Sequence, residues 1–370
     1  AEANSSGTRN IAIGHDAYTA SDTENDNMAI GYNAMTTNTA GGSENVAVGN
    51  YALDAHTSGD ENVAIGYQAL SANTTGSSNT AIGKGAMFAS TTGGANVAVG
   101  TNALNAINTG AGNQAIGNDA LGANTGGHSN QAMGRYALTA NTTGNQNTAI
   151  GHESLATNTT GSLNIGIGSG ALYANTTGTR NIAIGTQAYD LSDTENDNIA
   201  IGHNAMTTNT AGGTENVAVG NYALDALTSG DYNTAIGMSA LGANTTGSYN
   251  VAVGRSALVL NTTGAGNVSM GYASLAANTT GADNVGIGKN ALTANTTASN
   301  NTAVGKNSLI ANTTGDSNVA VGKDALLANT TGVAVVAVGV NALVANTTAS
   351  NGVAIGYNAL AANTTGEWNV

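Results

Sequence analysis

Side chains suited to binding recur in one sequence context along this 370-residue chain. Six of the eight Lys and Arg residues, three of the five His residues and four Tyr residues directly follow a Gly, and three more Tyr residues come one position later. Aromatic and Arg side chains are enriched at binding surfaces, so this pattern predicts a repetitive binding strip. A second interpretation is a tolerant surface position whose charges serve solubility. The candidate ligand-binding residues are Tyr32, Tyr67, Lys84, Arg135, Tyr136, His152, His203, Arg255, Tyr272, Lys289, Lys306, Lys323 and Tyr357.

Two short acidic segments carry the only metal-binding pattern that the sequence suggests. Alternate carboxylates in a short loop can present several oxygens to Ca²⁺. The candidate calcium ligands are Asp22, Glu24 and Asp26 in the first segment and Asp193, Glu195 and Asp197 in the second. Both segments lack the Gly and the distal Glu of an EF-hand, which favours a solvated acidic turn over a calcium site. We expect no other cofactor.

The remaining reactive residues do not form a catalytic pattern. The five His residues (His15, His56, His128, His152 and His203) show no recurring spacing to a carboxylate or a nucleophile. Gly-x-Gly strings such as Gly166-Ile167-Gly168 lack the strand–turn–helix context of a dinucleotide-binding loop. The sequence therefore predicts a protein that is not an enzyme.

The composition excludes several other classes of protein. The chain has 52 Gly, no Pro, no Cys and 8% charged residues, so helical bundles and disulfide frameworks are disfavoured. Hydrophobic residues make up 41%, which is too many for a disordered chain. The net charge of −14 leaves no basic patch for nucleic acid. No apolar run has the length of a membrane span, and no signal peptide is visible.

A repeat of 17 residues, lengthened to 18 in two units, organises the whole chain. We number each unit from its first Asn, so that Asn62, Val63, Ala64, Ile65 and Gly66 are positions 1 to 5. Position 5 is always Gly, position 4 is Ile, Val or Met, position 3 is small, and positions 12 to 15 mostly read Asn-Thr-Thr-Gly. Positions 6 and 7, which hold the candidate binding residues, vary freely.

This pattern predicts an all-β fold, a parallel β-solenoid (β-roll) of about 21 coils with 17 residues per coil. We expect strands near positions 1–5 and 8–12, with positive φ angles at the Gly residues of positions 5 and 15. Stacked coils would align the position-1 Asn residues into an amide ladder. The prediction is a single domain over residues 1–370, a segment of a longer fibre, with an internal duplication of residues 8–178 in 179–349.

The alternation of large and small residues predicts which side of the strand faces the coil interior. If the small residues at positions 3 and 8 point inward, Val63, Ile65 and their equivalents form an apolar stripe too large for a soluble monomer. Another copy of the chain is then the simplest partner that could bury this apolar stripe. The opposite orientation would allow a monomer. Polar residues at position 2, such as Thr80 and Gln114, favour the outward orientation of the large side chains.

The segment Val63-Ala64-Ile65-Gly66-Tyr67-Gln68-Ala69 resembles the head repeat of trimeric autotransporter adhesins of the YadA type. Similar segments occur in every coil. In that family three chains pack around one axis as left-handed parallel β-rolls, so the resemblance implies a homotrimer. The present chain differs in having Asn before the Val or Thr, in its longer period, and in lacking a coiled-coil stalk and a membrane anchor.

These observations predict an extracellular or cell-surface fibrous adhesin, or a structural fibre, that binds host matrix or surface glycans through many weak contacts. A phage tail-fibre shaft and a self-assembling extracellular filament subunit are alternatives based on the same physics. An ice-binding protein is a further alternative, suggested by the Thr residues at positions 13 and 14. Nucleic acid is not an expected partner.

Overall fold

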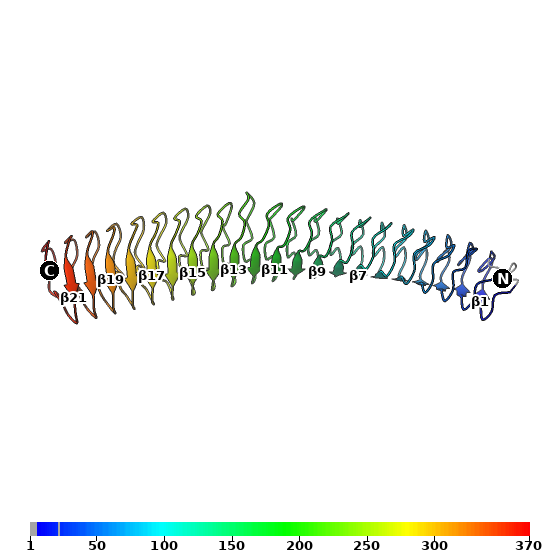
Figure 1. Cartoon of the computed structure of the whole chain (residues 1–370), viewed down its shortest axis with the longest axis horizontal. Coiled ribbons are helices and arrows are strands. Elements are labelled where there is room, and N and C mark those ends of the chain that lie inside the picture. Colours follow the sequence, from blue (N-terminus) through cyan, green and yellow to red (C-terminus); the bar gives the residue numbers. More distant parts are fainter. Residues whose placement is uncertain (1–5, 21–22) are drawn as a thin grey trace. The chain divides into compact units, whose positions relative to one another are not determined.

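The computed structural model describes residues 6–20 and 23–370, which form two compact units. Unit 1 extends to Asn181 and unit 2 begins at Ile182, close to the boundary between the duplicated sequence blocks. In the described ranges the secondary structure consists of three-residue strands and turns, without a helix. Each unit is a parallel β-solenoid with one strand per coil (Figure 1). The predicted all-β parallel β-solenoid with about 17 residues per coil is thus confirmed.

Every strand occupies positions 2 to 4 of its coil. Unit 1 contains β1 (Ile11–Ile13), β2 (Met28–Ile30), β3 (Val46–Val48), β4 (Val63–Ile65), β5 (Thr80–Ile82), β6 (Val97–Val99), β7 (Gln114–Ile116), β8 (Gln131–Met133), β9 (Thr148–Ile150) and β10 (Ile165–Ile167). Unit 2 contains β11 (Ile182–Ile184), β12 (Ile199–Ile201), β13 (Val217–Val219), β14 (Thr234–Ile236), β15 (Val251–Val253), β16 (Val268–Met270), β17 (Val285–Ile287), β18 (Thr302–Val304), β19 (Val319–Val321), β20 (Val336–Val338) and β21 (Val353–Ile355).

Within each unit, strands that follow one another in the sequence pair in parallel and in register. Val63 of β4 lies beside Thr80 of β5, and Ile65 lies beside Ile82. Equivalent positions of the repeat therefore lie above one another, so that each position of the sequence becomes a column of side chains. This columnar order decides which residues can act together.

The prediction of a second strand at positions 8–12 is wrong. That segment forms turns because positions 7 and 9 adopt positive φ angles, for example 56° at Gln68 and 53° at Leu70. Alternating residues with positive φ cannot continue an extended strand. The backbone still bonds between coils, since the Leu70 N–H donates to the Ala86 carbonyl at 2.9 Å.

The two recurrent Gly residues are required for different reasons. Gly66, at position 5, has a φ of 136°, and a Cβ there would lie 2.5 Å from the Gly83 carbonyl oxygen of the next coil. Only Gly satisfies both constraints. Gly76, at position 15, lacks a positive φ, which corrects the prediction; a Cβ there would overlap with the Gly93 carbonyl oxygen. Ala298 and Ala349 nevertheless occupy position 15, so that site is less strict.

The coil interior combines small and large apolar side chains with two columns of Asn. Ala64, Ala69 and Leu70, at positions 3, 8 and 9, are fully buried. At position 1, the Asn62 Nδ2 donates to Asn45 Oδ1 at 3.1 Å and to the Gly76 carbonyl at 2.9 Å, which confirms the predicted amide ladder. Buried amides satisfied in this way fix the spacing of the coils.

Candidate functional site

The outer side of the strands forms an apolar surface, which we call the strand face and define as the side chains at positions 2 and 4. Ala64 between them is buried, whereas Ile65, Ile116 and Met133 at position 4 expose 39%, 40% and 49% of their surface. Unit 2 repeats this pattern, with Ile236 41% exposed. The predicted outward orientation of the large residues is confirmed. Each unit thus carries a largely apolar stripe of the kind that marks an interaction site.

The candidate binding residues lie beside the strand face, after the turn at the position-5 Gly. We call positions 6 and 7 together the corner column. Every candidate at position 6 is exposed, and Tyr136 at position 7 is half-buried. The exposed candidates are Tyr32, Tyr67, Lys84, Arg135, His152, His203, Arg255, Tyr272, Lys289, Lys306, Lys323 and Tyr357. Their columnar arrangement places chemically similar groups in series along each unit.

Four aromatic rings in unit 1 form a continuous ladder on the corner column. His15 stacks on Tyr32 with 5.5 Å between ring centroids, Tyr32 meets Tyr51 edge-on at 5.4 Å, and Tyr51 meets Tyr67 edge-on at 6.1 Å. The neighbouring rings partly desolvate Tyr51, which raises the pKa of its phenol. The aromatic ladder is an exposed apolar platform with hydroxyl groups at its edge, a surface suited to stacking against a sugar ring or another aromatic group.

Cationic side chains of the same column lie over Tyr rings. The Arg135 guanidinium is 4.5 Å from the centroid of the Tyr136 ring, and the Lys289 ammonium is 5.8 Å from that of Tyr272. The hydrogen bond from Arg135 to the Tyr136 hydroxyl raises the pKa of the guanidinium. These cation–π contacts hold flexible side chains in place and thereby lower the entropy lost on binding a partner.

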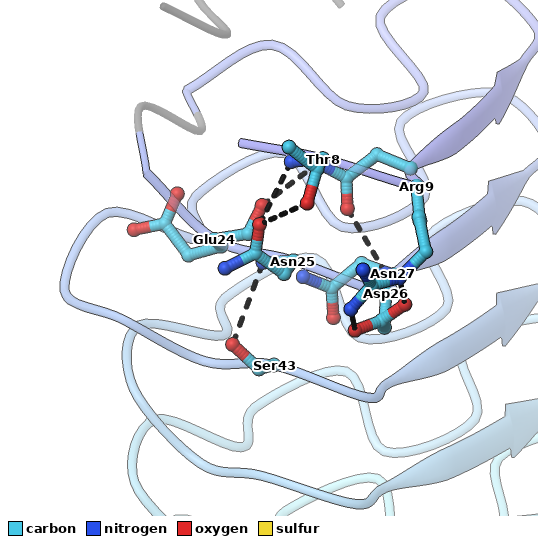
Figure 2. A network of polar contacts seen from close by, with 8 residues as sticks. Thr8, Arg9, Glu24, Asn25, Asp26, Asn27 and Ser43 are labelled. Carbon is cyan, nitrogen blue, oxygen red and sulfur yellow. Dashed lines mark hydrogen bonds and ion pairs between the residues drawn. The ribbon is translucent and has the colours of Figure 1, made fainter. Parts of the chain in front are cut away.

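The acidic segment of unit 1 forms hydrogen bonds and an ion pair with other residues of the protein (Figure 2). Arg9 forms two charge-assisted contacts with Asp26, and these lower the pKa of the Asp26 carboxyl. The Asn25 Oδ1 accepts from both the backbone N–H and the hydroxyl of Thr8, each at 2.8 Å. Figure 2 shows the Glu24 side chain directed away from Asp26. Asp22 lies outside the described residues.

Glu24 occupies position 15, where most coils have Gly. Its carboxylate is 2% exposed and accepts from the backbone N–H groups of Thr23 and Gly41, each at 3.0 Å. Gly41 belongs to an 18-residue coil and has a φ of 104°. The additional residue in the next coil makes room for a side chain that the regular coil excludes. The acidic residue at position 15 and the extra residue in the next coil therefore belong to one structural feature.

Unit 2 repeats this feature. The Glu195 carboxylate is 3% exposed and accepts from the N–H groups of Asp193 at 2.9 Å, Thr194 at 3.1 Å and Gly212 at 3.1 Å. Over residues 6–20 and 23–370 no three His, Cys, Asp or Glu side chains converge to hold a metal ion. The structure therefore does not bring the described calcium candidates together, because the Glu carboxylates bind backbone N–H groups.

His56 is the one buried member of the five His residues. It replaces Asn at position 12, where its Nε2 lies 2.7 Å from the Gly59 carbonyl and its Nδ1 lies 3.3 Å from Asn73 Nδ2. These partners require a neutral ring with the proton on Nε2, since Nδ1 must accept. Burial lowers the pKa of His56. Of the others, His15, His152 and His203 lie on the corner column, and His128 accepts from the Ala111 N–H at 3.0 Å.

The Asn-Thr-Thr-Gly segment has a structural role that sequence reasoning missed. At position 12, Asn141 Nδ2 donates to Asn124 Oδ1 at 3.0 Å, which begins a second buried amide ladder. At position 13, the Thr74 hydroxyl donates to the Thr91 carbonyl of the next coil at 3.0 Å. At position 14 Thr75 is exposed, whereas most Thr residues at position 13 are half-buried. A single exposed column is a poor basis for the flat array of Thr residues that the ice-binding alternative needs.

Comparison with models of known protein families and with curated protein sequences gave no match. The described part of the chain contains no helix that is long and apolar enough to cross a membrane. The strand face and the corner column are the two exposed surfaces available for binding.

Proposed function

We propose that this chain is a fibrous adhesin or structural fibre that acts outside the cell as a homotrimer. The observation that carries the proposal is the division of each coil into two exposed surfaces, an apolar strand face and a polar, aromatic corner column. In this assembly the strand faces of three copies cover one another, and the corner columns stay accessible. The resemblance to YadA-type head repeats supports the same arrangement.

The proposed ligand is a surface that is itself repetitive, such as extracellular matrix or a surface glycan. Each contact at a Tyr, His, Lys or Arg of the corner column is weak. Simultaneous contacts along a fibre raise the effective concentration, so avidity exceeds the affinity of any single site by orders of magnitude. Such a protein needs a stiff scaffold and an accessible strip more than an enclosed pocket.

The mass in solution tests the assembly. We expect three times the chain mass of 36.1 kDa by light scattering. Replacing Ile65 and its duplicate Ile236 by Glu would bury charge in the assembly, so the mass should fall to that of the monomer. The matched control replaces Thr75 and its duplicate Thr246, exposed in the turn, by Glu and should leave the mass unchanged. A monomeric parent chain would contradict the trimer, and a very large polymer would favour the filament.

Binding to glycan and matrix arrays tests the ligand. We expect the parent chain to bind at least one class of surface, and Tyr32→Ser with Tyr67→Ser to weaken that binding by about tenfold or more, because stacking on the aromatic ladder is lost. Tyr232→Ser removes a 46% exposed ring at position 17, away from the corner column, and serves as the control. Equal losses for both variants would contradict a role of the corner column.

A further inference from the structure

The repetition of the strand face creates a problem for its association with other copies. Neighbouring strands present almost the same residues, as when Val63 and Ile65 of β4 lie beside Thr80 and Ile82 of β5. Sliding one copy past another by one coil would replace apolar contacts by near-identical ones. An entirely apolar seam therefore specifies association but leaves the register open.

Two adjacent residues of unit 1 interrupt the apolar pattern. Gln114 of β7 and Gln131 of β8 are partners in the sheet, both are exposed, and both stand at position 2. All other described strands carry Val, Ile, Met or Thr at that position. The two Gln residues line one shallow hollow together with Ile116, Met133 and Ile150. Their duplicates in unit 2 are Val285 and Thr302, so this feature occurs once per chain.

We propose that Gln114 and Gln131 set the register in which copies of this chain associate. The inference rests on the proposed self-association. When parallel copies are in register, each Gln faces the same Gln of a partner, and primary amides can both donate to and accept from one another. After a slip of one coil, Gln131 of one copy still meets Gln114 of another, but the remaining Gln residues lie against Val97 and Thr148 of their partners. A buried amide without a hydrogen-bond partner destabilises the assembly, and each further copy adds to this penalty.

The size of the strand face favours a second copy of the chain as its binding partner. A three-residue strand is about 10 Å long and ten strands stack over about 48 Å, so the strand face of one unit covers about 500 Å². Two such units per chain provide on the order of 1,000 Å², above the roughly 800 Å² per partner of a stable interface. A single buried Asn fixes the register of coiled coils by the same physics.

Disulfide trapping tests the register, because the chain contains no Cys. Single Cys residues are introduced in place of Val48, Ile65 or Ile82 on chains that carry tags of different size, and the chains are refolded together. The Val48 and Ile82 sites are two coils apart, about 10 Å along the unit and beyond the reach of a disulfide, and the Ile65 and Ile82 sites detect a slip of one coil. In the parent background we expect cross-links between identical positions and few between different ones.

The decisive variant gives unit 1 the residues of unit 2, Gln114→Val with Gln131→Thr. We expect an unchanged mass and at least a tenfold rise in cross-links between different positions. The control, Thr302→Val, removes a short polar residue at the same position and should not change the pattern. A trimer whose cross-links stay in register in the double variant would overturn this inference alone. A monomeric parent chain would overturn both the inference and the proposed function.

Discussion

The two duplicated blocks share one coil design but differ at several buried positions, and the contrast of interest lies at position 12, where unit 1 has His56 and unit 2 has Leu227. Both side chains are fully buried. His56 makes polar contacts with Gly59 and Asn73, whereas Leu227 fills the same position with an apolar side chain. Position 12 of the interior therefore accepts a polar side chain as well as an apolar one, and at His56 the polar ring finds partners within its own and the next coil.

The strongest test of the common design addresses position 5 in both units. Gly66→Ala in unit 1 and its duplicate Gly237→Ala in unit 2 each place a Cβ within 2.6 Å of a backbone atom of the next coil, at a φ that L-residues disfavour. We expect each to destabilise its own unit by more than about 3 kcal/mol, measured by hydrogen exchange of the surrounding coils. Gly126→Ala, where the nearest atom is 3.8 Å away, is the control. A small effect at Gly66 would contradict the close stacking.

Acid should distinguish the two units through His56. Its neutral form is favoured in the fold and its folded pKa is lowered, so the unfolded chain binds the proton more readily. The contribution of His56 to stability is complete above its unfolded pKa of about 6.5, and falls by up to about 1.4 kcal/mol per pH unit as the pH drops toward the folded pKa. Asp60 is the charged group that partly opposes the lowering.

Hydrogen exchange, corrected for intrinsic rates, should therefore show residues 45–79 opening below pH 6.5 while residues 216–250 stay protected. His56→Leu should remove this difference, and Leu227→His should transfer it to unit 2. Equal acid sensitivity of both segments in the parent chain would contradict the assignment to His56.

The amide ladder offers a smaller contrast, because it ends early in unit 2. Val335 and Gly352 replace Asn at position 1, whereas in unit 1 each described coil start from Asn10 to Asn181 is Asn. In Val335→Asn the new amide can donate to Asn318 Oδ1, which already accepts from the Val335 N–H at 3.0 Å. We expect a gain of about 1 kcal/mol in the local stability of unit 2, measured by denaturant-dependent exchange. A loss of stability would indicate that the new amide lacks a partner.

The aromatic ladder should give the smallest effect. Tyr51 contacts two rings, whereas its duplicate Tyr222 contacts only His203 among the described residues. Each aromatic pair contributes about 0.5–1.5 kcal/mol to stability. Tyr51→Ala should therefore lower the free energy of unfolding more than Tyr222→Ala does, by the contribution of one aromatic pair. Thermal unfolding of the two variants checks the order. Equal losses would show that the rings do not interact.

Much of the fold follows from the sequence because a repeat with a fixed period must stack like on like. The alternation of Val63, Ala64 and Ile65 predicted the strand and the inward direction of Ala64, and the position-1 Asn predicted the amide ladder. The second strand was predicted wrongly, since Ala69 and Leu70 read as extended residues although Gln68 and Leu70 adopt positive φ. The type of a non-Gly residue gives little indication that its φ angle is positive.

The sequence alone determined the coil, its period, the single Gly that no other residue can replace, and the column to which each exposed side chain belongs. These features depend on local geometry and on repetition, both of which are visible in one chain. Only the tertiary structure decided that Glu24 is buried against backbone N–H groups, that Asn141 belongs to a ladder, and that His15 and three Tyr residues form one platform. The contacts between coils in these features join residues about 17 positions apart, and their geometry depends on how closely one coil approaches the next.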